Sequence, residues 1–229
     1  LFMDGDLVEG VGVYPNHEKD LVIKDIYKQY ERFAELLAII PKQISIILCG
    51  GNHDALRLAE PQPELYKDLA KPLWDLPNVT ITTNPSTINI HSSDKFQGFN
   101  VLMYHGSSMP YYYTNIDSIR LAGGINKADV VMKLFLQKRH LAPSHTSTLY
   151  VPSRTEEDPL LIETIPDFFV TGHIHKVVAT NYKGTSLICS SSWVTSTPYQ
   201  ERRGIVPESF KVILVSLKTR EFRILNFED

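Results

Sequence analysis

The chain has 229 residues, of which 43% are apolar and 21% are charged, so it can bury a full core within one domain. Its formal net charge of −3 excludes a strongly basic protein that captures nucleic acid through its own electrostatic field. No apolar stretch approaches the ~20 residues of a membrane-spanning helix, and the N-terminus lacks the basic segment of a signal peptide. We therefore expect a soluble protein that makes no contact with a membrane.

The two cysteines, Cys49 and Cys189, each close an apolar, strand-like run. A buried and reduced thiol is the commoner state of such a residue, compared with a disulfide. We therefore expect a reducing, cytoplasmic compartment.

Strand and helix patterns alternate over the first part of the chain. Residues 1–3 have strand character, residues 18–40 carry apolar side chains at nearly helical spacing, and residues 44–49 return to strand. This order of strand, helix and strand favours parallel pairing in an α/β fold. The further elements expected here are a short helix over 62–73 and strands over 79–83, 87–91 and 99–104.

The rest of the chain begins with helices and ends with strands. We expect two helices between 115 and 138 and a surface loop over 142–158, followed by strands over 168–170, 177–182, 185–189, 210–217 and 221–227. This pattern fits a single domain over residues 1–229, with two facing β-sheets flanked by helices.

Four short segments place metal-binding side chains directly after strand-like runs. They are Gly5-Asp6, Gly51-Asn52-His53-Asp54, His105-Gly106 and Gly172-His173-Ile174-His175. Loops of this kind gather at one edge of an α/β sheet, where glycine lets side chains converge without backbone clashes. A mixed set of carboxylate, carboxamide and imidazole groups suits manganese, iron or zinc. The sequence therefore predicts a metal-assisted hydrolase.

Each of these residues also has a simpler interpretation. Asp6 could be a turn residue, and His53 a solvated loop residue. His173 and His175 could be a buried structural pair, but their spacing favours a shared site, because side chains two apart in an extended segment point the same way. The remaining histidines are not expected in the site: His17 and His145 are assigned to solvent, His140 is assigned a structural role, and His91 has no functional context.

The order of the four segments resembles the calcineurin-like metallophosphoesterases. Their pattern runs Asp-x-His, Gly-Asp, Gly-Asn-His-Asp/Glu, His and Gly-His-x-His, and every part after the first occurs here in order. The resemblance implies an αββα fold with two divalent ions. We expect manganese, with iron, zinc or magnesium as alternatives.

The resemblance also implies ligand roles. Asp6 is the carboxylate that bridges the two ions, Asn52, His105 and His173 bind the second ion, and His175 binds the first. The Asp-x-His motif, which supplies two more ligands to the first ion, does not occur in these residues. We therefore expect the 229 residues to bind at most one ion tightly, and the parent sequence to continue upstream.

His53 and Asp54 are the catalytic pair that the resemblance implies. His53 binds no metal and stabilises or protonates the leaving oxygen, and Asp54 orients its imidazole.

The segments around these motifs are similar to the small subunits of archaeal D-family DNA polymerases. The resemblance rests on residues 6–15, 139–143, 165–175 and 190–193. It implies a 3′-5′ proofreading exonuclease that acts on DNA 3′ ends in a heterodimer with a large catalytic subunit. The alternatives are a non-catalytic scaffold, as in the related eukaryotic subunits, and a generic metallophosphoesterase.

Two aromatic features have open roles. The run Tyr111-Tyr112-Tyr113 follows the His105 loop, where such rings either stack unpaired bases, at ~1–3 kcal/mol each, or pack in the core. Trp193 follows three serines at the end of an expected strand and is a candidate for the wall of the cleft.

Overall fold

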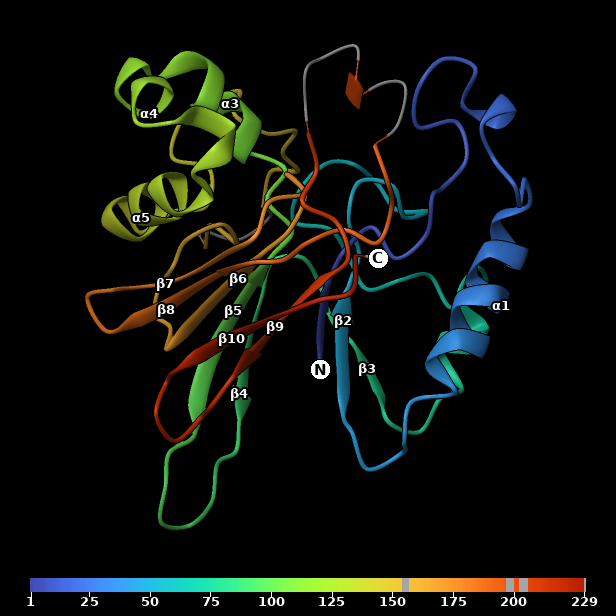
Figure 1. Cartoon of the computed structure of the whole chain (residues 1–229), viewed down its shortest axis with the longest axis horizontal. Coiled ribbons are helices and arrows are strands. Elements are labelled where there is room, and N and C mark those ends of the chain that lie inside the picture. The colour runs from blue at the N-terminus through green and yellow to red at the C-terminus, as the bar shows by residue number, and fades with distance from the viewer. Residues whose placement is uncertain (154–156, 197–199, 202–205, 229) are drawn as a thin grey trace. The chain divides into compact units, whose positions relative to one another are not determined.

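The computed structural model describes residues 1–153, 157–196, 200–201 and 206–228. Its contacts divide the chain into two compact units (Figure 1). The first unit comprises Leu1–Ser86 and Leu149–Pro159, and the second comprises Thr87–Thr148 and Leu160–Asp229. The expected single domain over residues 1–229 stays a prediction.

The first unit is built on a parallel sheet in the order β1-β2-β3. The strands are β1 (Phe2–Asp4), β2 (Ile46–Cys49) and β3 (Val79–Ile81). Met3 lies opposite Leu48 and Leu48 lies opposite Ile81, so the apolar strand centres are in register. The parallel pairing expected from the strand-helix-strand pattern is confirmed.

Helix α1 (Ile26–Leu37) connects β1 to β2. It begins at residue 26 because the Asp25 side chain accepts hydrogen bonds from the N–H groups of Tyr27 and Lys28. Tyr30, Ala34 and Leu37 recur at helical spacing and pack with the buried β2 side chains. The helix is shorter than the expected 18–40, since residues 17–19 form a separate 3-10 turn, η1 (His17–Lys19).

The helix expected over 62–73 is reduced to a single turn, α2 (Lys71–Trp74). The backbone of Gln62 pairs with that of Asn84 through Gln62 N to Asn84 O (2.7 Å) and Asn84 N to Gln62 O (3.1 Å). That pairing holds the segment in an extended conformation, which a helix would abolish.

The second unit contains a five-stranded sheet in the order β4-β5-β6-β8-β7. Its strands are β4 (Ser86–Ile90), β5 (Phe99–Tyr104), β6 (Phe168–Thr171), β7 (Val178–Tyr182) and β8 (Thr185–Cys189). The β5-β6 and β6-β8 pairs are parallel. The antiparallel β7-β8 hairpin turns at Lys183 and Gly184, both with positive φ, as a two-residue hairpin turn requires.

Helices accompany this sheet in Figure 1: α3 (Met109–Asn115), α4 (Asp117–Leu121), the turn η2 (Gly124–Asn126) and α5 (Ala128–Lys138). Helix α5 packs on β7 and β8, and its buried Met132 and Phe135 share a core with Phe169 and Leu187. Helix α3 is an addition to the two expected helices. Sheets flanked by helices confirm the α/β class.

The chain ends in an antiparallel hairpin of β9 (Lys211–Val215) and β10 (Phe222–Asn226). Arg220, just before β10, donates to the backbone oxygen of Asp167 (2.7 Å) and to its Oδ1 (2.8 Å). The guanidinium also lies over the rings of Phe99 and Phe168, at 5.0 and 4.5 Å from their centroids. One side chain therefore fastens the hairpin to the start of β5 and β6.

Along the described residues, no helix has both the length and the apolar character that crossing a membrane would demand. Cys49 and Cys189 lie at the ends of β2 and β8, and both are buried as expected and not joined in a disulfide.

Candidate metal centre

In the first unit, the turn after β1 is tied to the loop after β2. Asp6 lies in this turn with a left-handed backbone (φ 50°), and its Oδ1 accepts a hydrogen bond from the backbone N–H of His53 (2.8 Å). The expected bridging carboxylate and the expected catalytic histidine are thus joined through a backbone contact. Asn52, the neighbouring expected ligand, is half-buried.

Asp54 anchors the loop after β2. Its carboxylate is 4% exposed and accepts hydrogen bonds from Gly51 N (2.8 Å), Leu7 N (3.2 Å) and the hydroxyl of Tyr30 (3.1 Å). Burial raises the pKa of Asp54 to about 6, and the negative charge of Asp6 adds to this shift, while the three donors partly oppose it. Burial of the Tyr30 hydroxyl, together with the charge of Asp54, raises the pKa of Tyr30.

The imidazole of His53 is oriented by a different group from the one that the sequence suggested. Its Nδ1 lies 2.9 Å from the backbone oxygen of Glu9. The hydrogen bonds that Asp54 makes to described residues go to backbone N–H groups and to Tyr30. Asp54 therefore shapes the loop that carries His53, and Glu9 contacts the ring. The catalytic roles of His53 and Asp54 stay predictions.

In the second unit, His105 and His173 come together. His105 follows β5 and is 1% exposed, and its ring centroid lies 5.0 Å from that of His173. The backbone N–H of Gly172 donates to His105 O (3.0 Å), which joins the loop after β6 to the loop after β5. A Cβ at Gly106 (φ 107°) would meet Met109 Sδ at 2.9 Å and His173 Cβ at 3.5 Å, so this turn leaves little room for a side chain.

The backbone around His173 and His175 is not the extended segment that the spacing argument assumed. Strand β6 ends at Thr171, and both histidines adopt left-handed φ values of 65° and 53°. Between them, Ile174 is buried in the core, and its N–H donates to Gly172 O (2.7 Å). The alternation rule for strands does not apply to such a turn, so it cannot be the reason for a shared site.

Left-handed backbone marks three of the five expected ligands, namely Asp6, His173 and His175. Asp and His adopt this region more readily than most residues, yet it remains uncommon for any residue with a Cβ. Such conformations gather at functional sites, where the surrounding structure holds them in place. This independent observation favours a functional interpretation of these turns.

Side chains that the sequence pattern did not place in the site surround the His53 loop. His17, expected in solvent, is 1% exposed, and its Nδ1 accepts from Val13 N (3.3 Å). Gln29 and Tyr30 reach the loops after β1 and β2 from α1. Helical spacing marked Tyr30 as a core residue, but no local pattern distinguished Gln29 or His17 from exposed polar residues.

Of the two roles considered for the run Tyr111-Tyr112-Tyr113, the structure favours packing in the core. Tyr112 is fully buried and Tyr113 is 7% exposed, and both belong to the core of the second unit. The Tyr112 hydroxyl donates to Ser147 Oγ (3.1 Å) and accepts from Ser144 N (3.0 Å). Only Tyr111 is half-buried.

The donor atoms suit a divalent transition metal. The first unit offers the carboxylate of Asp6 and the carboxamide of Asn52, and the second offers imidazoles at His105, His173 and His175. Paired, partly buried imidazoles with carboxylate oxygens are ligands that manganese, iron and zinc accept. The residues present therefore fit a divalent metal. The identity and number of the ions stay predictions.

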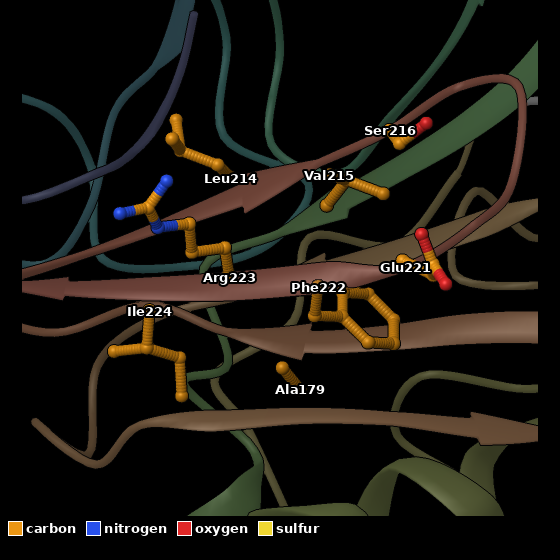
Figure 2. A pocket seen from close by; sticks show the side chains of 8 residues that line it. All are labelled: Ala179, Leu214, Val215, Ser216, Glu221, Phe222, Arg223 and Ile224. Carbon is orange, nitrogen blue, oxygen red and sulfur yellow. The ribbon is translucent and has the colours of Figure 1, made fainter.

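Figure 2 shows a shallow groove of the second unit, where side chains of β9 and β10 lie near Ala179 of β7. Its lining comprises Ala179, Leu214, Val215, Ser216, Glu221, Phe222, Arg223 and Ile224. These include none of the expected ligands, so the groove is not part of the candidate site.

Comparison with known proteins adds two findings. Residues 1–177 match the family described as calcineurin-like phosphoesterase. The chain is also similar to proteins named DNA polymerase II small subunit: 38% identical over 230 residues in Pyrococcus abyssi, 35% over 225 residues in Methanothermobacter thermautotrophicus and 39% over 204 residues in Archaeoglobus fulgidus.

These matches cover 99%, 97% and 89% of the chain but only 35%, 44% and 39% of the relatives, so the chain spans less than half of their length. The two resemblances inferred from the sequence, to the calcineurin-like phosphoesterases and to archaeal DNA polymerase small subunits, are therefore confirmed as sequence similarities.

Proposed function

Because the chain belongs to the calcineurin-like phosphoesterase family, we propose that it is a metal-dependent 3′-5′ exonuclease, working as the small subunit of a D-family DNA polymerase. The observation that carries the proposal is the hydrogen bond from His53 N to Asp6 Oδ1, which couples the loop of a general acid to a metal-binding carboxylate. The retained donor residues favour an enzyme over a scaffold.

The proposed metal ligands follow the family pattern. Asp6 is the bridging carboxylate, Asn52, His105 and His173 serve the second ion, and His175 serves the first. Two bound divalent ions supply a water of lowered pKa and neutralise charge on the scissile phosphate. This assignment rests on the family pattern and on the chemistry of the donors.

His53 is proposed to act at the leaving group. Hydrolysis forms a bond between a water oxygen and phosphorus and breaks the bond to the 3′ oxygen of the preceding nucleotide, which must gain a proton. With Nδ1–H of His53 facing the Glu9 carbonyl, Nε2 is the nitrogen left to donate that proton, which it carries in the imidazolium form of the ring.

A large catalytic subunit is the proposed partner, since the relatives are named as small subunits of a DNA polymerase. The net charge of −3 supports this assignment, because affinity for the phosphate backbone comes mainly from clustered Lys and Arg. We expect the partner to deliver the DNA 3′ end. Activity should then rise well above the sum of the separate subunits, and equal activity with and without the partner across a salt titration would contradict this delivery.

The test uses the complete gene product, alone and with its large subunit, on 5′-labelled single strands and on primers with a mismatched 3′ end. In manganese we expect stepwise shortening from the 3′ end, which stops in a chelator and on strands with hydrolysis-resistant 3′ linkages. If the folded, metal-loaded protein releases no nucleotide with manganese, iron, zinc or magnesium, the proposal is wrong and the scaffold function is favoured.

A further inference from the structure

We propose that Gln29, on helix α1, is a positioning residue for His53. Gln29 is 6% exposed, and its side-chain amide makes three hydrogen bonds. Its Oε1 accepts from Gly10 N (2.9 Å), and its Nε2 donates to Gly10 O (2.9 Å) and Ile23 O (2.8 Å). The orientation of the amide is fixed, because the backbone N–H can only donate and the two carbonyls can only accept.

Gln29 is connected to His53 through a single peptide group, the one between Glu9 and Gly10. The N–H of Gly10 and the C=O of Glu9 belong to the same planar unit, in which they point in opposite directions. Gln29 holds the N–H end, and the oxygen at the other end lies 2.9 Å from Nδ1 of His53. Rotation of this peptide would therefore break both contacts at once.

Gly10 makes the close approach possible. Its φ is +75°, and a Cβ at this position would lie 2.1 Å from the backbone oxygen of His53. The turn therefore packs directly against the residue whose ring it contacts. Any other side chain here would push the Glu9 carbonyl away from the imidazole.

The contact determines which ring nitrogen of His53 carries the proton. A carbonyl oxygen can only accept, so Nδ1 of His53 must bear hydrogen, and in the neutral ring Nε2 is left bare. His17, in the same turn region, is held the opposite way: its Nδ1 accepts from Val13 N (3.3 Å), so its proton lies on Nε2. The unit thus contains two histidines fixed in opposite tautomers.

The catalytic importance of the contacts from Gln29 through the Glu9–Gly10 peptide to His53 rests on the proposed function. Their effect on the His53 tautomer can be measured without any reaction. In protein with ¹⁵N-labelled histidine at about pH 8.5, where imidazole is neutral, two-bond ¹H–¹⁵N correlations distinguish the tautomers. Signals are assigned with His53→Gln and His17→Gln. We expect the Nδ1–H form for His53 and the Nε2–H form for His17.

Gln29→Met keeps the length of the side chain and removes the amide. We expect the His53 signal to move to a mixture of tautomers while His17 keeps its Nε2–H form. In the metal-loaded enzyme, kcat should fall by about tenfold to a hundredfold with little change in KM, because the ring is misplaced while the proposed metal ligands are unchanged. Leu37→Ala, in the buried face of the same helix, is the control for lost stability and should leave the His53 tautomer unchanged.

An Nε2–H form of His53 in the wild-type protein overturns the proposal. An unchanged tautomer signal of His53 in folded Gln29→Met also overturns it. If that variant does not fold, the same criterion applies to Gln29→Asn, whose shorter amide cannot reach Gly10. Absence of nuclease activity in the wild-type enzyme would instead count against the proposed function and leave the tautomer result standing.

Discussion

The hydroxyl of Tyr30 on α1 donates a hydrogen bond to Oδ1 of Asp54 in the loop after β2, at 3.1 Å, and accepts one from Ala55 N at 3.0 Å. A helix residue thus contacts the two residues that directly follow Asn52 and His53. These two hydrogen bonds attach the loop after β2 to helix α1.

Replacing Tyr30 by Phe should lower the free energy of unfolding at neutral pH by about 1–3 kcal/mol, because it leaves the buried Oδ1 of Asp54 and the part-buried N–H of Ala55 without their partner. It should also raise the pKa of Asp54 further, since the Tyr30 hydroxyl lowers that pKa. Urea unfolding measures the first effect. Tyr27→Phe, exposed on the same helix, is the matched control, and equal losses in the two variants would contradict the contact.

The raised pKa of Asp54 predicts a pH dependence of stability in the metal-free protein. The pKa rises from 3.8 to about 6 on folding, so the folded state binds the proton more tightly than the unfolded state. Stability should therefore fall as the pH rises from about 4 to about 6, by about 3 kcal/mol, and then level off. The measurement is urea unfolding in a chelator, for the wild type and for Asp54→Asn.

All other titrating groups contribute to both proteins, so the difference between the two curves isolates Asp54. Parallel curves from about pH 4 to about pH 7 would show that the carboxylate is not held in a raised-pKa environment.

Arg220 predicts a stability effect without an effect on catalysis. Lysine at this position loses the planar fork that contacts Asp167 and stacks on Phe99 and Phe168, so Arg220→Lys should lower the unfolding free energy by about 1–2 kcal/mol. Activity per folded molecule should not change. Arg223→Lys, exposed on the same hairpin, is the control, and a similar loss there would remove the special role of Arg220.

His105 is the best-buried of the expected ligands and tests the metal assignment. His105→Ala should weaken manganese binding by at least about tenfold to a hundredfold, because it removes a ligand itself, whereas loss of an outer contact already costs that much. Elemental analysis after dialysis against limiting manganese measures the loss. His145→Ala, in an exposed loop, should retain the metal content of the wild type. Equal metal content in both variants would show that His105 is not a ligand.

The strands and the loop residues that follow them could be predicted from the sequence, because both are marked by local patterns. Strand β5 was placed at its observed bounds, and β1, β2 and β6 nearly so, because apolar runs that end in glycine or polar residues mark both a strand and its loop. The placement of Asp6, His105 and His173 directly beyond strand ends follows from the same signal.

Contacts between segments that are distant in the chain could not be predicted from the sequence. Leu7 and Asp54 are 47 positions apart, and Gly10 and Gln29 are 19 apart, so no periodicity connects them. The contact of the His53 ring with Glu9 was hidden for a similar reason, because it is made by a backbone carbonyl, which leaves no trace in residue type. Strand alternation misjudged the turn of His173 and His175, where the backbone becomes left-handed.

The central claim is that His53 performs the chemistry without binding metal, and the most direct test is the turnover of His53→Ala on DNA with a mismatched 3′ end, at manganese content equal to that of the wild type. We predict that turnover falls by about 10²–10⁴-fold while the metal content is unchanged, as expected for the loss of a general acid. His145→Ala should keep the wild-type rate. A wild-type rate in metal-loaded His53→Ala would contradict the account.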